Sequence, residues 1–460
     1  MGYFHIPLWL IRHCISITSG GLDSSAQSLD WIRQRTGLDP AASLESLSFV
    51  STTSSTICMD CRGGRMLCGK SRCPILSKAE VIVKHLPQFN SEQIEGSSPP
   101  GAFVGQFGYP NVYVGPLIPP MKGDTRHLDM PELWLGKDIQ TIIDYRFSLI
   151  RGKARVDVHD AADPSAYLVD LHDLALSQAS VDVDARFSKK PRMAVMLSEE
   201  TQPFGPSALI RDLKISPSTG DRKLEAVYYD GDQLANGGIV DLYKQGVEVS
   251  RIQKILSLGM LGIQKQRKIV PTRWGITAVD DTLSKHLLRS IKHYPPVDKY
   301  QVYKYNYLDN VYSAIFSPRN WEFEWIEAWF PGTAWNETGS VPAMMGDQEP
   351  YEGRTTYAAV GGCYYSCRLA AAEALQRVQR QAAVLVIREI RPGYILPVGV
   401  WNVRESVRAA FRTEPVSFDT FNEALRFACV NMVIRPDTWT KNSKLIRNEM
   451  YQPRLSHYFQ

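Results

Sequence analysis

Four cysteines crowd a short stretch of the chain and carry its clearest chemical signal. They occur as Cys58-x2-Cys61-x6-Cys68-x4-Cys73 in CMDCRGGRMLCGKSRC, with no histidine between them. Zn²⁺ prefers a tetrahedron of soft ligands, and a CxxC pair presents two sulfurs to one ion through a tight turn. We therefore predict one structural zinc ion per chain, held by four thiolates without an open catalytic position.

Basic residues lie between these cysteines. A small zinc module with a cationic surface can bind the phosphates of DNA. The same charges could instead do no more than keep the surface solvated, and the sequence leaves both interpretations open. The residues are Arg62, Arg65, Lys70 and Arg72.

A second cationic cluster lies in GIQKQRKIVPTRWGITAVDDTLSKH, residues 262–286. Cations interleaved with an aromatic ring suit phosphate contact combined with base stacking, so this segment is a candidate DNA-binding site. Its candidate residues are Lys265, Arg267, Lys268, Arg273 and Trp274.

Asp280 and Asp281 follow in the same segment, close to an expected helix start. Paired carboxylates can hold Mg²⁺ for phosphodiester chemistry, which makes them candidate catalytic residues. They can also cap the helix or form a salt bridge to Arg273, and we favour this structural role.

Other side chains of catalytic type are interpreted as structural. Two His-Asp pairs are isolated, and two cysteines four residues apart have no histidine or third cysteine nearby. The sequence contains neither a Walker loop, a GxGxxG fingerprint nor a GxSxG elbow. The residues concerned are His159-Asp160, His172-Asp173, Cys363 and Cys367.

The C-terminal stretch YQPRLSHYFQ is unusually apolar for a chain end. In one helical turn, Leu455, Tyr458 and Phe459 fall at i, i+3 and i+4 and form one apolar surface, with Gln452 before it. Such a short element suits a hydrophobic pocket on a partner protein. The alternative is an aromatic tail folded onto its own domain.

Bulk properties set limits on the function. The chain has 460 residues, 44% hydrophobic and 22% charged, with a formal net charge of +4. This composition is globular, and any DNA-binding surface must be a local patch. No apolar stretch is long enough to cross a bilayer. We expect a cytoplasmic protein in a reducing compartment.

The elements that must position these residues follow from the apolar periodicity. Helical spacing is found over 166–179, 240–261 and 368–381, and strand patterns over 299–317 and 383–390. The expected helices and strands do not alternate regularly along the chain, which predicts an α+β fold. We expect a flexible extension over 1–57, a zinc module over 58–80, a core over 81–435 and a tethered peptide over 436–460. A surface loop or subdomain seam is expected near 344–356.

Four tryptophans gather in NWEFEWIEAWFPGTAW. Spacing of four residues would place the first three on one helical face, where burial in a core or interface is expected. One of them could instead stack on a base. They are Trp321, Trp325, Trp329 and Trp335.

Several of these motifs together resemble the archaeal Nre family of DNA-repair proteins. The cysteine pattern is similar to the family's N-terminal zinc motif, and the chain end resembles a PCNA-interacting peptide. Three internal blocks also resemble family signatures, although the zinc motif here lies further from the start than is usual. The blocks are FVGQFGYPNVYVGPL (103–117), KIVPTRWGITAVDDTLSK (268–285) and PVGVWNVRESVR (397–408).

The resemblance implies a role in repairing damaged DNA, beside excision-repair proteins, with recruitment to the PCNA sliding clamp. It does not specify a reaction. The leading hypothesis is a zinc-containing protein that binds DNA and the clamp. The alternatives are a metal-dependent nuclease or other DNA-processing hydrolase that uses Asp280 and Asp281, and a non-catalytic scaffold tethered to the clamp.

Overall fold

The structure is a computed structural model that describes residues 69, 90–192, 201–202, 205–334, 336 and 339–451. Several predicted features lie outside these residues. They are the extension 1–57, the zinc candidates Cys58, Cys61, Cys68 and Cys73 with the basic residues between them, Trp335, and the peptide residues Gln452, Leu455, Tyr458 and Phe459.

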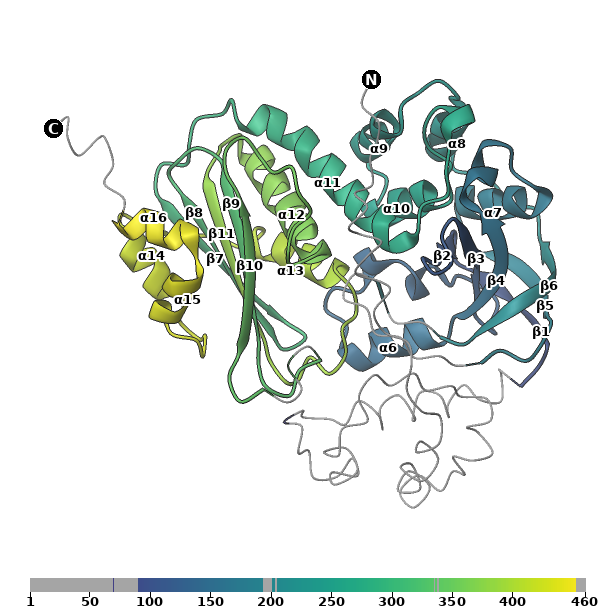
Figure 1. Ribbon diagram of the computed structural model, residues 1–460, viewed down its shortest axis with the longest axis horizontal. Helices are drawn as coiled ribbons and strands as arrows, with labels where there is room; N and C mark the ends of the chain where they lie inside the picture. The colour runs from purple at the N-terminus through teal and green to yellow at the C-terminus, as the bar shows by residue number, and fades with distance from the viewer. Residues whose placement is uncertain are drawn as a thin grey trace, which may run out of the picture.

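Two six-stranded sheets organise the described residues, and helices pack against both (Figure 1). The predicted α+β class is confirmed. The first sheet has the order β1-β5-β6-β4-β3-β2, with β4 and β6 parallel and the other neighbours antiparallel. Its strands are β1 (Gln93–Ser98), β2 (Ala102–Val104), β3 (Asn111–Ile118), β4 (Ile150–Asp157), β5 (Val181–Phe187) and β6 (Ser207–Ile215).

Short helices surround this sheet. The predicted helical spacing over 166–179 and 240–261 is confirmed by α7 and by the α9–α10 pair, which a turn at Gly246 separates. The helices are α6 (Ile139–Phe147), α7 (Ala166–Leu176), α8 (Arg222–Tyr229), α9 (Ala235–Lys244) and α10 (Val249–Ser257). Single 3-10 turns are η2 (Arg126–Leu128), η3 (Pro131–Leu133), η4 (Val158–Ala162) and η5 (Gln264–Gln266).

The second sheet has the order β10-β9-β11-β8-β7-β12, in which β11 and β9 are parallel and the other neighbours antiparallel. Every residue of β11 is buried, because helices cover both faces of this sheet. Its strands are β7 (Tyr300–Tyr307), β8 (Asn310–Ser317), β9 (Glu322–Trp329), β10 (Ala343–Glu349), β11 (Ala383–Ile390) and β12 (Val416–Phe418).

Two helical layers enclose the second sheet (Figure 1). α11 (Thr272–Ile291), α12 (Gly362–Val378) and α13 (Trp401–Ala410) pack on the face toward the first sheet. They share one continuous apolar core with β3, α7 and α10. α14 (Phe421–Ala428), α15 (Pro436–Asn442) and α16 (Lys444–Tyr451) cover the opposite face around a separate core.

Two local predictions differ from the structure. The tryptophan-rich segment is strand β9, not a helix, although the predicted burial of Trp321, Trp325 and Trp329 is confirmed. Spacing of four residues also keeps side chains on one face of a strand, so the pattern could not separate the two. Residues 344–349 of the expected loop near 344–356 belong to the edge strand β10, which begins at Ala343.

Candidate nucleic-acid interface

The candidate site begins at the first turn of α11, which carries Arg273 and Trp274. Pro271 is the N-cap residue, where its missing N–H costs no hydrogen bond. The hydroxyl of Thr272 accepts a hydrogen bond of 3.0 Å from the backbone N–H of Val104 in β2. This bond fixes the start of α11 against the edge of the first sheet.

Trp274 contacts the loop that joins β2 to β3, which we call the aromatic loop (residues 105–110). The ring centroids of Trp274 and Tyr109 are 5.3 Å apart and the rings are tilted by 55°. Tyr109 is 40% exposed and Phe107, at the loop tip, is 59% exposed. Segments far apart in the sequence therefore present three aromatic rings in one region.

The segment before α11 runs past the same region. The backbone N–H of Ile269 donates to the carbonyl of Val158 at 2.8 Å, and the N–H of Val158 donates to the carbonyl of Pro110 at 3.0 Å. Lys265 and Lys268, in and beside η5, are exposed. The structure thus places Lys268 near the aromatic loop, whereas Lys265 lies in η5, where the N–H of Gln264 donates to the carbonyl of Gly231.

Arg267 has a structural role instead. It is only 7% exposed, and its guanidinium donates to the carbonyls of Gly262 at 2.9 Å and of Tyr228 at 2.7 Å. The same group lies 5.2 Å from the ring centroid of Tyr228. Burial lowers the pKa of Arg267. Its donors secure the segment before α11 to α8, so we leave it out of the interface.

A row of basic side chains on β4 extends the candidate surface. Arg151, Lys153 and Arg155 alternate along the strand and therefore share one face, which we call the β4 basic row. Tyr113 of β3 pairs directly with Arg155 in the sheet register, so its ring lies on this face. The ammonium group of Lys153 is 5.8 Å from the centroid of that ring.

The β4 basic row adjoins the aromatic loop. A Cβ atom built on Gly105, the first residue of the loop, would lie 3.4 Å from a guanidinium nitrogen of Arg151. Burial lowers the pKa of Arg151 to about 10. Burial and the nearby Arg151 charge lower the pKa of Lys153. Clustered cations of this kind would be stabilised by an anionic ligand such as a phosphodiester.

The β4 basic row is not among the candidates predicted from the sequence motifs. Its signal is nevertheless present in IRGKARVD, where basic residues occupy every second position of a predictable strand. A search for dense cationic runs overlooks this pattern because the alternate positions carry small residues.

The catalytic candidates Asp280 and Asp281 lie within α11, well after its first turn, so the prediction that they cap the helix is wrong. Asp280 is buried, with both oxygens 3.0 Å from a guanidinium nitrogen of Arg404. Asp281 is bound by Arg368 and by Lys285 at 2.8 Å.

The two carboxylates point to different partners because successive residues on a helix are about 100° apart. The salt bridge expected between this pair and Arg273 is replaced by those to Arg404, Arg368 and Lys285. In the part of the chain that the structure describes, no group of three His, Cys, Asp or Glu side chains could hold a metal ion. This arrangement favours a structural role for Asp280 and Asp281 over Mg²⁺ binding.

The remaining candidates have the expected structural roles. The two ring nitrogens of His172 are 3.1 Å from the hydroxyl of Tyr228 and 3.1 Å from the carbonyl of Leu258. His159 is paired with Asp157 at 2.7 Å in η4. Cys363 and Cys367 are buried in the first turns of α12 and form no disulfide.

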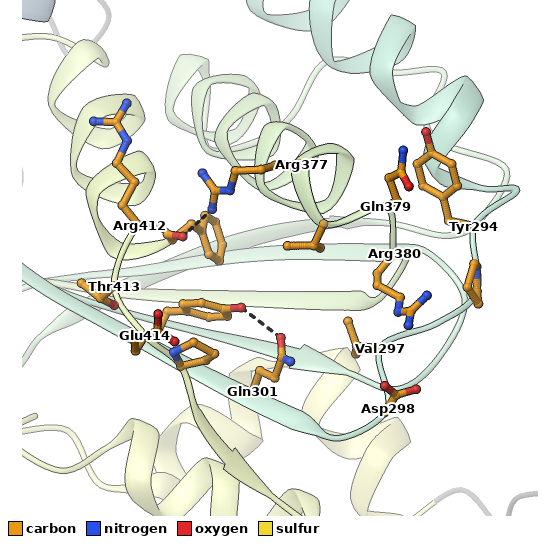
Figure 2. A pocket seen from close by; sticks show the side chains of 15 residues that line it. Tyr294, Val297, Asp298, Gln301, Arg377, Gln379, Arg380, Arg412, Thr413 and Glu414 are labelled. Carbon is orange, nitrogen blue, oxygen red and sulfur yellow. Dashed lines mark hydrogen bonds between the residues drawn. The ribbon is translucent and has the colours of Figure 1, made fainter.

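A hollow of about 800 Å³ lies where α12 and α13 both end, above β7 (Figure 2). Arg377, Arg380 and Arg412 line it together with Asp298 and Glu414. The arginines offset the partial negative charge at two helix C-termini. This hollow is therefore a weaker candidate for binding a polyanion than the β4 basic row.

No described helix is long and apolar enough to cross a membrane. No solved structure matches the chain significantly.

Comparison of this chain with family models and with individual related proteins identifies the same family. The model for the archaeal Nre N-terminal region matches residues 67–336, and the model for the archaeal Nre C-terminal region matches residues 349–458. The DNA repair protein NreB of Archaeoglobus fulgidus is 42% identical over 85% of this chain and 97% of its own. The NreA proteins of Archaeoglobus fulgidus and Haloferax volcanii are 37% and 36% identical, over 81% and 76% of this chain and 93% and 87% of their own. This chain belongs to the archaeal Nre family.

Proposed function

We propose that this protein acts in DNA repair by binding DNA directly through its first sheet and by docking on the PCNA sliding clamp through its C-terminal peptide. The repair role is supported by the names of three relatives, each described as a DNA repair protein. The cysteines Cys58, Cys61, Cys68 and Cys73 would hold one structural zinc ion. Gln452, Leu455, Tyr458 and Phe459 would contact the clamp.

One observation carries the DNA-binding proposal. The β4 basic row, the aromatic loop and the first turn of α11 form one neighbourhood, although they come from three separate parts of the chain. Among the described residues, no carboxylate forms a salt bridge with Lys153, Arg155 or Lys268. Nearby Asp157 and Asp160 are engaged in the η4 capping box and with His159. These cations can therefore bind phosphates, and the aromatic rings beside them can stack on bases. Nucleic-acid-binding surfaces combine the same two features.

The direct test replaces Lys153 and Arg155 together by Gln and measures DNA binding by fluorescence anisotropy over a salt series. We expect weaker binding to all DNA forms, and a plot of log K against log salt that is shallower by about one unit per lost phosphate contact. The matched control replaces Arg426 and Lys441, which are exposed on the opposite helical layer, by Gln. Equal affinity of the two double variants would contradict the proposed surface.

A further inference from the structure

The side chain of Phe107 is large, apolar and exposed to solvent. Hydrogen bonds hold the backbone of its loop in place. The N–H of Gly105 donates to the carbonyl of Tyr113 at 2.8 Å, and the N–H of Asn111 donates to the carbonyl of Gly108 at 2.9 Å. Gly108 has φ +85°, and a Cβ there would lie 2.7 Å from the carbonyl oxygen of Asn111. Only glycine fits that turn, so the sequence itself specifies a tight tip that presents Phe107.

Tyr109, two residues after Phe107 in the same loop, is held in place by a second ring. Tyr109 rests on Trp274, which belongs to the first turn of a long helix packed into the main core. An isolated exposed aromatic residue needs no explanation. Here, however, the exposed ring of Phe107 and the half-exposed ring of Tyr109 belong to one short loop, and the helix residue Trp274 contacts Tyr109. Such a platform costs little conformational entropy when it binds a flat ligand, because it is already ordered.

Cations flank the platform on two sides. Lys153 and Arg155 lie on the adjacent face of the first sheet, and Lys268 lies on the segment that leads to α11. Within a regular duplex the faces of the bases are hidden by stacking, and only phosphates and groove edges are available. A base that has left the stack offers its π-face, and its flanking phosphates remain within reach of neighbouring cations.

We infer that the aromatic loop stacks on an unpaired or unstacked base, so that the preferred ligand of this surface is single-stranded or locally opened DNA and not intact duplex. This inference rests on the proposed function and specifies its substrate class. Phe107 is the stacking residue, the Tyr109–Trp274 pair holds the loop that carries it, and the β4 basic row binds the adjacent phosphates.

The experiment compares three labelled DNAs of equal length by fluorescence anisotropy: a single strand, a perfect duplex, and a duplex with a central unpaired bubble. The wild-type chain should prefer the single strand and the bubble. Phe107→Ala should weaken binding to these two by roughly 5- to 100-fold, as expected for one lost base stack, and leave duplex binding unchanged. Phe107→Trp should retain the preference.

Two controls keep the result interpretable. Tyr451→Ala removes an aromatic ring of 70% exposure from the opposite flank of the molecule and should change nothing. Thermal unfolding should confirm that Phe107→Ala is folded, since its side chain is largely outside the core.

The outcomes separate this inference from the proposed function. If the wild-type chain binds no DNA at all, the proposed function fails. If it binds DNA but Phe107→Ala binds all three ligands like the wild type, only the stacking inference is overturned. An equal loss on all three ligands would overturn it too, because the ring would then contribute to general affinity and not to recognition of an open base.

Discussion

His172 is a residue of a type common in active sites, but here its side chain has a structural role. It is buried, and its two ring nitrogens face the hydroxyl of Tyr228 and the carbonyl of Leu258. Burial lowers its pKa to about 4, with a smaller contribution from the charge of Arg267. The folded state thus holds a neutral imidazole, whereas the unfolded chain would titrate near its ordinary pKa of about 6.5.

This arrangement predicts a pH-dependent loss of stability. Above pH 6.5 the lowered pKa of His172 costs the folded state no stability. As the pH falls from 6.5 toward 4, the free energy of unfolding decreases by up to about 1.4 kcal/mol per pH unit, because the unfolded chain binds a proton that the folded chain does not. Thermal unfolding of the wild type should therefore shift to lower temperature between pH 7 and pH 5. His172→Gln should be less stable at pH 7 but show a smaller shift. If both chains lose equal stability, His172 is not responsible.

Residue types alone could predict that His172 is structural, but not what holds Asp280 and Asp281. Their partners Arg404 and Arg368 lie on α13 and α12, more than eighty positions away in the sequence. The prediction paired them with Arg273, although Lys285, four residues after Asp281 in the same segment, is nearer and does bind Asp281. Long-range pairing of this kind depends on how helices cross, which local spacing does not encode.

At the scale of elements, apolar periodicity identified β11 and α12 because their patterns are long and regular. It failed for β9, where a tryptophan every fourth residue fits both a helix and a strand. The β4 basic row was also predictable in principle, since alternate cations on a strand must share a face. What brings that row beside the aromatic loop is sheet register, and register is set by partners distant in sequence.

One prediction at this scale concerns the attachment of α16. Glu324, in the middle of β9 and only 4% exposed, accepts hydrogen bonds from the hydroxyl of Ser443 and from the N–H groups of Lys444 and Leu445, both at 2.8 Å. A strand carboxylate thus satisfies the first amides of the helix that leads into the C-terminal peptide.

Glu324→Gln should lower the free energy of unfolding by about 1–3 kcal/mol, because the charge is lost and an amide N–H₂ group now faces backbone donors. Hydrogen exchange at the amides of α16 should accelerate more than exchange in α12. Glu322→Gln, at the more exposed start of the same strand, serves as the control. Unchanged protection of α16 would mean that its apolar contacts alone hold it in place.

For the whole molecule, the proposed DNA-binding surface and α16 lie on opposite flanks. The β4 basic row belongs to the first sheet, while α16 ends in the helical layer beyond the second sheet (Figure 1). A shared core that includes β3, α11 and α12 joins the two halves. DNA bound on the first sheet would therefore not cover α16, after which the proposed clamp-binding peptide follows in the sequence.

We predict that DNA and the PCNA clamp bind this chain at the same time and independently. Calorimetry should give the same clamp affinity for the free chain and for the chain saturated with bubble DNA. Removing residues 452–460 should abolish clamp binding without changing DNA affinity, because no interface residue is lost. The variant with Gln at positions 153 and 155 should show the opposite pattern. If the truncated chain still binds the clamp, the C-terminal peptide is not the docking element. If DNA and clamp compete, they share a surface and the two flanks do not act separately.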